Sequence, residues 1–172
     1  MDIIGEKVIL KPLTRDLCHE IYKKYVADPM MTDEVYNYSI EKVDNYFNAR
    51  INDTKRKIFA IIVEGAAIGE VQIKYINNVI RKGNLGIHLA NDSIKGKGYG
   101  TESERLIIKY AFEHLGLNIL YADAVLRNTR SQYIMQKLGF QYVYEDEIFK
   151  YYELKKSNWK NNSNLPKGLP ID

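Results

Sequence analysis

The chain reads Lys95-Gly96-Lys97-Gly98-Tyr99-Gly100-Thr101-Glu102-Ser103-Glu104 between a short apolar strand pattern at residues 85–89 and a long helix pattern. Its three glycines occupy alternate positions, and glycine lacks the Cβ atom that clashes at positive φ, so the backbone can curl. A curled turn directs its N–H groups inward, and the following helix adds the positive end of its dipole. Two lysines lie in the same turn. The stretch therefore predicts a diphosphate site formed by the main-chain N–H groups of residues 95–101.

Two known glycine motifs do not fit this stretch. A Walker-type loop needs Ser or Thr after Gly-Lys to reach a magnesium ion, and here Gly98 follows Lys97. The dinucleotide fingerprint needs a third glycine three positions after the second, where the chain has Thr101. A glycine-rich turn without a ligand is the alternative, but the lysines, the strand and the long helix favour an anion site. The spacing alone leaves a nucleotide open as the ligand.

Composition limits the class of protein. The chain has 172 residues, of which 45% are hydrophobic, and this fits one compact domain. Its 25 basic and 22 acidic residues leave a net charge of +3, too balanced for a dedicated nucleic-acid binder. The single cysteine, Cys18, excludes an internal disulfide. With no signal peptide and no apolar run of about 20 residues, we expect a cytoplasmic protein without membrane contact. The three histidines are scattered, so no metal site is expected.

Hydrophobic periodicity predicts alternating groups of strands and helices. Strands are expected at residues 8–10, 58–63, 68–75, 85–89, 119–125, 142–144 and 149–154. Helices are expected after the caps Thr14 and Ser39, over residues 98–114, and from Asn128. We expect one domain over residues 1–156. The tail at residues 157–172 is rich in Asn, Lys and Pro and is predicted to be disordered.

A second segment, residues 128–140, begins with asparagine and ends in Lys-Leu-Gly-Phe. Together with the glycine stretch it resembles the GNAT superfamily of acyl-CoA N-acyltransferases. The cofactor loop of that family reads Arg or Gln, two residues, Gly, one residue, and Gly or Ala, and here Lys95, Gly98 and Gly100 take these places. The run Gly-Lys-Gly-Tyr-Gly-Thr-Glu and the Asn-x-x-Ser start are similar to the ribosomal-protein (RimJ/RimL-like) branch. The resemblance covers residues 6–156.

The resemblance implies an α/β (α+β) single-domain fold with helices on both faces of a mixed, mostly antiparallel sheet of about seven strands. Two parallel strands are expected to splay apart and to leave a gap for the pantetheine arm of acetyl-CoA. Splayed strands leave peptide groups unpaired, and such groups need partners. We therefore expect Ile87, His88 and Leu89 to bind the arm through their main chain.

The implied reaction is direct attack of a primary amine on acetyl-CoA in a ternary complex, by a monomer or homodimer. The amine belongs either to a protein N-terminus or to a small molecule. Glu70 is expected as the general base, and Ser131 is expected near the thioester sulfur. Cofactor contacts are expected from Lys95, Gly96, Lys97, Gly98, Tyr99, Gly100, Thr101, Asn128 and Ser131.

Two positions depart from the family. Many members have a tyrosine five residues before the phenylalanine of the later motif, as the acid for the leaving thiolate, and here that residue is Met135. Relatives of the branch often have a glutamate where this chain has Asn84. Because of these departures, a non-catalytic acyl-CoA-binding module remains the alternative to an enzyme. At the residue level, His88 is a second candidate base, and Asn128 can serve as a plain helix cap.

Overall fold

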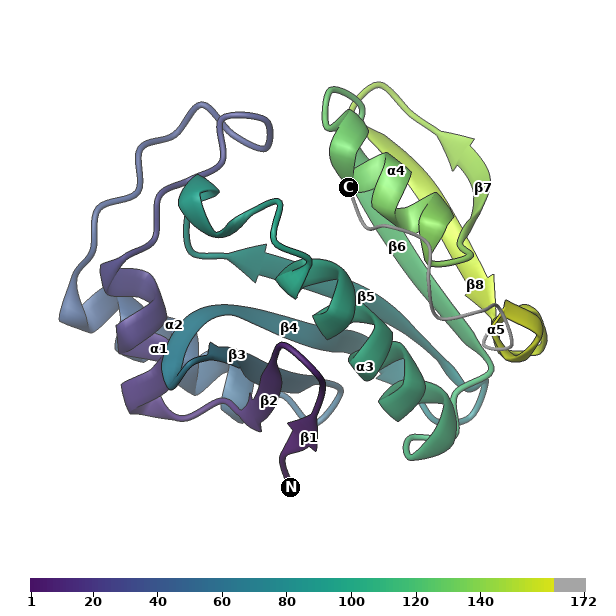
Figure 1. Ribbon diagram of the computed structural model, residues 1–172, viewed down its shortest axis with the longest axis horizontal. Coiled ribbons are helices and arrows are strands. Elements are labelled where there is room, and N and C mark those ends of the chain that lie inside the picture. The colour runs from purple at the N-terminus through teal and green to yellow at the C-terminus, as the bar shows by residue number, and fades with distance from the viewer. Residues whose placement is uncertain (163–172) are drawn as a thin grey trace.

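The computed structural model describes residues 1–162. Eight strands form one sheet in the order β1-β2-β3-β4-β5-β6-β8-β7 (Figure 1). The two-residue strand β1 is an addition to the seven strands that periodicity predicts, because a strand of that length shows no alternation. The strands are β1 (Ile3–Ile4), β2 (Ile9–Pro12), β3 (Lys57–Val63), β4 (Ala66–Asn77), β5 (Lys82–Leu89), β6 (Ile119–Val125), β7 (Gln141–Glu145) and β8 (Phe149–Lys155). The helices are α1 (Arg15–Lys23), α2 (Ile40–Ile51), the 3₁₀ turn η1 (Asp92–Ile94), α3 (Tyr99–Glu113), α4 (Thr129–Lys137) and α5 (Lys156–Asn162).

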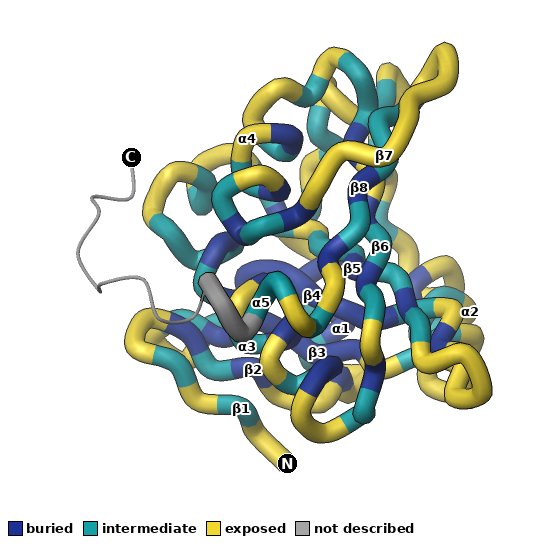
Figure 2. Tube along the Cα trace, turned by 90° about the vertical axis from the view of Figure 1, so that its right-hand side faces the viewer, coloured by how far each residue is buried: buried dark blue, intermediate teal, exposed yellow. Residues whose placement is uncertain are grey.

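Alternating side chains of the central strands divide the core into two layers. On β3, Ala60 and Ile62 pack with α1 and α2, whereas Phe59 and Ile61 pack with α3 on the other face. This alternation follows from the pleat of a strand, whose successive side chains point to opposite faces. The helices therefore cover both faces of the sheet, as predicted. Figure 2 shows that β3 and β4 are the most buried strands, while β7 lies exposed at one edge.

The sheet opens between its two parallel strands. β5 pairs with β6 only over residues 82–84, opposite residues 119–121. Beyond Asn84 and Tyr121 the two strands continue to Leu89 and Val125 without pairing with each other, and Figure 1 shows them diverging. The predicted splay is confirmed, and it places a wedge between the end of β5, the start of α3 and the start of α4.

A side chain of α3 fixes the glycine stretch to the N-terminal turn. The carboxylate of Glu102 accepts hydrogen bonds from the backbone N–H groups of Glu6 (3.1 Å), Lys7 (2.8 Å) and Val8 (2.8 Å). Charge-assisted bonds of this kind are the stronger ones. The first turn of α3 is therefore anchored to the turn between β1 and β2.

The C-terminal prediction is wrong for residues 157–162, which belong to helix α5. The ring of Trp159 lies 5.5 Å from that of Phe112, so this helix packs against the α3 layer. One large aromatic side chain thus outweighs a composition typical of disorder. The remainder of the predicted tail, residues 163–172, lies outside the described residues. Within residues 1–162, no helix has the length and apolarity that crossing a bilayer requires.

Candidate active site

The glycine stretch forms a curled loop that leads into α3. Gly96 and Gly98 have φ values of 82° and 83°, in the left-handed region where only glycine is unstrained. Gly98 is the N-cap of α3 and has no side chain to cap the first-turn N–H groups. An uncapped helix start with a positive dipole end suits an anion. Gly100 lies inside the helix, where its Cα faces Ile87 and Leu89 of β5.

The side chain of Lys95 is engaged in ion pairs. Its Nζ atom lies 2.5 Å from Asp28 Oδ2 and 2.8 Å from Asp92 Oδ1. Burial acts to lower the pKa of Lys95, but the hydrogen bonds to the two carboxylates outweigh it and raise the pKa. The Lys95 side chain is therefore not free to face a ligand in the loop, and binding through the main-chain N–H groups stays a prediction.

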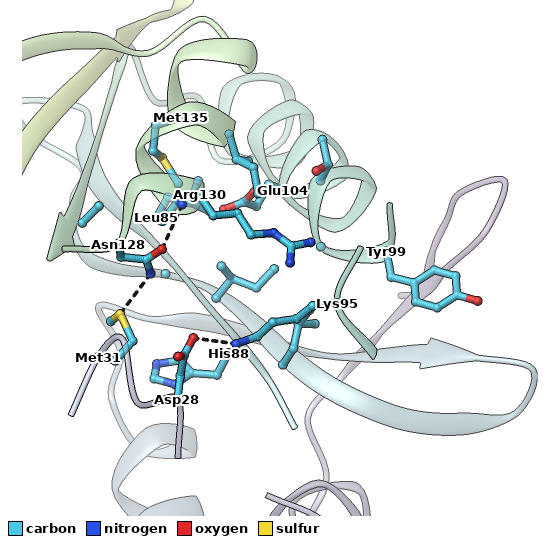
Figure 3. Close-up of a pocket in the computed structure, with 18 of the residues that line it drawn as sticks. Asp28, Met31, Leu85, His88, Lys95, Tyr99, Glu104, Asn128, Arg130 and Met135 are labelled. Carbon is cyan, nitrogen blue, oxygen red and sulfur yellow. Dashed lines mark hydrogen bonds and ion pairs between the residues drawn. The ribbon is translucent and has the colours of Figure 1, made fainter. Parts of the chain in front are cut away.

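A cavity of about 340 Å³ lies in the wedge (Figure 3). It brings together every predicted cofactor-binding residue except Lys97. The predicted residues in its wall are Ile87, His88, Leu89, Lys95, Gly96, Gly98, Tyr99, Gly100, Thr101, Asn128 and Ser131. Lys97 and Glu70 lie outside the cavity wall in the part of the chain that the structure describes.

The main chain of β5 offers peptide groups to the cavity at alternate residues. The N–H of Ala90 donates to Ile68 O (2.8 Å), and His88 is paired with Glu70 in the same register. The main-chain groups of His88 therefore face β4, whereas those of Ile87 and Leu89 face the gap. The prediction that His88 binds through its main chain is wrong, because strand alternation turns its peptide groups away. His88 contributes its side chain instead.

A segment of residues 28–33, here called the strap, crosses the mouth of the cavity. At its start Asp28 pairs with Lys95, and two residues later Met30 O accepts a hydrogen bond from Arg127 Nε (2.8 Å). At the next residue Asn128 Nδ2 donates to Met31 Sδ (3.3 Å), as Figure 3 shows. The strap thus links the glycine loop to the start of α4.

Asn128 begins α4. Its Oδ1 atom accepts a hydrogen bond from the N–H of Ser131 (3.1 Å), so the helix cap that sequence leaves open as an alternative is present. Its amide nitrogen reaches the cavity and the strap. Arg130 also lines the cavity, opposite Gly96, whereas Arg127 is engaged by the strap.

Glu70 does not lie where a base that contacts substrate would lie. It is fully buried, with 0% exposure, and its Oε1 accepts a hydrogen bond from the Tyr46 hydroxyl. Its Oε2 has no hydrogen-bond partner among the described residues. Burial and the charge of Glu70 raise the pKa of Tyr46, which keeps that phenol a donor. The predicted direct role of Glu70 therefore needs correction, because α2 covers the strand face from which it projects.

His88 is the basic group that the cavity exposes. It is directly opposite Glu70 on the neighbouring strand, so both side chains project from the same face of the sheet. Its ring is accessible inside a concave wall of protein. Desolvation by that wall lowers the pKa of His88, Lys74 and Arg50 lower it further, and Glu70 opposes them. The imidazole is therefore neutral at pH 7 and able to accept a proton.

Aromatic and acidic side chains also line the cavity. Tyr25 and Asp28 follow α1 in the chain, and Asp123 belongs to β6. Behind Tyr25, the rings of Tyr22 and Tyr36 lie 5.4 and 5.0 Å away. Sequence reasoning missed Asp123, although its alternation with Tyr121 on a strand was a usable signal.

Sequence reasoning also missed Glu104 as a cavity residue. Its spacing of three and four residues from Ile107 and Ile108 places it on the buried stripe of α3. A carboxyl group on such a stripe is unusual, because burying a polar group without a partner is costly. That conflict in the pattern was the available signal.

Comparison with known proteins identifies the family to which this chain belongs. The family model of the acetyltransferase (GNAT) domain matches residues 7–141. The chain belongs to the GNAT acetyltransferase family. It is therefore an acetyl-CoA-dependent N-acetyltransferase, and its co-substrate is acetyl-CoA. Within residues 1–162, no group of three or more His, Cys, Asp or Glu side chains is placed to hold a metal ion.

Two relatives have names that describe acetyltransferases of different kinds. Spermidine N(1)-acetyltransferase of Escherichia coli (strain K12) is 29% identical over 139 residues, which cover 79% of this chain and 74% of the relative. The Bacillus subtilis (strain 168) protein called "Putative ribosomal N-acetyltransferase YdaF" is 31% identical over 80 residues, covering 46% of this chain and 43% of that one. The RimJ/RimL-like branch is thus not specifically supported and stays a prediction.

Solved structures share the fold. Spermidine N-acetyltransferase from Vibrio cholerae, in complex with CoA and spermine, superposes with a TM-score of 0.78 at 19% identity, covering 91% of this chain and all of that one. A dodecameric structure of spermidine N-acetyltransferase from the same organism has a TM-score of 0.72 at 19% identity, with 93% of this chain covered and 100% of that chain. The expectation of a monomer or homodimer stays a prediction.

Proposed function

We propose that the acceptor of this enzyme is a small aliphatic polyamine. The observation that carries this proposal is the set of acidic and aromatic side chains in the cavity wall, namely Tyr25, Asp28 and Asp123. Carboxylates attract ammonium groups, and aromatic faces bind cations and the methylene groups between them. The name of the Escherichia coli relative and the spermine-bound Vibrio cholerae structure agree with an acceptor of this class.

The proposed cofactor position follows the main chain. The diphosphate of acetyl-CoA lies against the N–H groups of residues 96–101, at the uncapped start of α3. The pantetheine arm enters the wedge and pairs with the peptide groups of Ile87 and Leu89, which face the gap.

The acceptor must lose a proton before it attacks. A lysine-like amine, with a pKa near 10.4, lies about 3.4 pKa units above pH 7, a deficit of roughly 4.6 kcal/mol. A polyamine therefore needs a base in the site. We propose that His88 accepts the proton, directly or through one water, because it lines the cavity and its imidazole is uncharged at pH 7, with one ring nitrogen free to accept. Glu70 is then a positioning residue behind it.

The acceptor proposal is tested with a panel of amines, read out by release of free thiol. We expect kcat/KM for spermidine and spermine to exceed that for a peptide with a free N-terminus by at least about tenfold, because an α-amine brings only one positive charge to the acidic side chains of the cavity. Asp123→Asn should reduce the advantage of the polyamines. A preference for the peptide would contradict the proposal and would favour the ribosomal-protein branch.

Variants of Asn128 test the proposed binding site of acetyl-CoA. Asn128→Ala removes both the cap oxygen and the amide donor, so we expect a loss of about 1 kcal/mol in stability and an apparent KM for acetyl-CoA raised about five- to tenfold. Asn128→Ser keeps a capping oxygen and removes only the amide. It should retain the thermal midpoint and still raise KM. An unchanged KM in both variants would remove Asn128 from the cofactor site.

A further inference from the structure

Glu104 is a buried carboxyl group that the functions described above do not use. It projects from α3, is 2% exposed, and has no hydrogen-bond or ion-pair partner among the described residues. It nevertheless forms part of the cavity wall, and Figure 3 shows its carboxyl group pointing into the space beside α4. A buried carboxyl group without a partner that faces an open cavity is placed to meet a ligand there.

The position of Glu104 along the cavity is set by the helix. Gly100 lies at the level of Ile87 and Leu89, because a Cβ atom on it would contact both side chains at 3.7 and 3.6 Å. The next turn of α3, which holds Glu104, lies about 5.4 Å further along the helix axis. Because β5 runs antiparallel to α3, that distance corresponds to about two residues toward the start of β5. That level is Leu85, next to Asn84, where the parallel strands separate. Glu104 thus faces the closed end of the wedge.

Met135 of α4 lines the same end of the cavity. It is 5% exposed and occupies the position at which family members present a tyrosine acid. A thioether cannot donate a proton. Figure 3 shows Met135 and Glu104 reaching into the cavity from the two neighbouring helices. A carboxylic acid at this end of the cavity is therefore available from α3, in place of the tyrosine that Met135 replaces.

We propose that Glu104, as a neutral carboxylic acid, protonates the thiolate of coenzyme A as it leaves. The attack of the amine forms the C–N bond, and collapse of the tetrahedral intermediate breaks the C–S bond. The electron pair of that bond goes to sulfur, which takes the proton of Glu104. The proton that the amine nitrogen loses goes to His88 or to water, and solvent returns a proton to Glu104. This assignment rests on the proposed position of acetyl-CoA in the wedge.

The titration of Glu104 supports the role. Burial raises the pKa of Glu104 to about 8, and desolvation is the only cause of the shift. The charged or titratable groups that share the cavity come from every element around it and do not contribute to this pKa. They are Tyr25, Asp28, Lys74, His88, Lys95, Tyr99, Asp123 and Arg130. Roughly nine tenths of Glu104 is protonated at pH 7, and its acidity is close to that of a thiol with a pKa near 8.5.

The test compares Glu104→Gln with the wild-type enzyme across pH, using the amine with the highest turnover. Because a thiol leaves readily, we expect a modest loss in kcat of about tenfold at pH 7 for the variant. The ratio of the wild-type kcat to the variant kcat should fall toward one as pH rises above 9, since Glu104 ionises and the wild type also loses its acid. Taking a ratio cancels the titration of the amine and of His88.

Three further measurements keep the test specific. The affinity for desulfo-CoA should stay within about twofold, because the lost group acts on the sulfur. The thermal midpoint of Glu104→Gln should equal or exceed that of the wild type, since a buried carboxyl without a partner is removed. Glu113→Gln, at an exposed position of the same helix, is the matched control and should leave kcat unchanged.

Two results would overturn the assignment. One is a kcat ratio within twofold of one at every pH, and the other is a loss that does not vary with pH and comes with weaker desulfo-CoA binding. The second would make Glu104 a cofactor-binding residue. Failure of wild-type enzyme to bind desulfo-CoA would instead contradict the proposed cofactor site. A lack of turnover with polyamines alone would contradict only the proposed acceptor.

Discussion

Replacing His88 with alanine should lower kcat with a polyamine about a hundredfold at pH 7, the lower end of what a positioned base contributes. The reason is the protonation state of the acceptor, which is almost fully an ammonium ion at that pH. Without a base in the cavity, the enzyme depends on the small neutral fraction of the amine. The loss should therefore shrink as pH rises, by about tenfold for each pH unit.

The pH profile of the wild type gives the sign of the effect. His88 has a lowered pKa, so it is neutral above its ordinary value of about 6.5 and gains a proton only at lower pH. Activity should be flat near neutrality and should fall as pH drops through the lowered pKa. His88→Ala should lack this plateau and show kcat rising steadily with pH.

Two companion variants separate the role of His88 from its alternatives. His114→Ala, at the exposed C-cap of α3, is the matched control and should leave the profile unchanged. Glu70→Gln removes the charge that raises the pKa of His88, so the acidic limb should move to lower pH with a smaller loss of kcat. A hundredfold loss in Glu70→Gln together with a mild effect in His88→Ala would restore Glu70 as the base.

Replacing Gly98 with alanine should weaken acetyl-CoA binding about ten- to thirtyfold. An L-residue with a φ of 83° costs about 1–2 kcal/mol, and relief of this strain would turn the N–H groups of the loop away from the ligand. The dissociation constant, measured by calorimetry with desulfo-CoA, reports this directly. Turnover at saturating cofactor should change much less.

Gly65→Ala is the matched control for that experiment. Gly65 has almost the same φ, 82°, and no atom lies within 4 Å of the Cβ that alanine would add. It lies in the turn between β3 and β4, away from the cavity wall. Its replacement should cost similar stability and leave the affinity unchanged. Equal losses of affinity in the two variants would show that the effect of Gly98→Ala is general destabilisation.

Much of the fold was predictable because short stretches of sequence determine its elements. The alternation of β3 and β4, the caps Thr14 and Ser39, and the glycine run at residues 95–101 each specify an element directly. The order of the final strands was less accessible. β8 lies between β6 and β7, and no local pattern tells which of two consecutive strands becomes the edge.

The site was predictable where it consists of main chain. The curl of the loop follows from glycine spacing, and the main-chain roles of Ile87 and Leu89 follow from the splayed strands that the resemblance implies, whereas side-chain roles depend on tertiary contacts. In the structure, Tyr46 of α2 contacts and covers Glu70, and this contact is not visible in the sequence. The strap is invisible in sequence, since its contacts join residues such as Met30 and Arg127 that are far apart in the chain.

The most direct test of the account is a crystal structure of the enzyme with desulfo-CoA. We expect the diphosphate against the N–H groups of residues 96–101 and the pantetheine arm between β5 and β6, beside the peptide groups of Ile87 and Leu89. A complex in which β5 and β6 close on each other and the coenzyme lies elsewhere would contradict it.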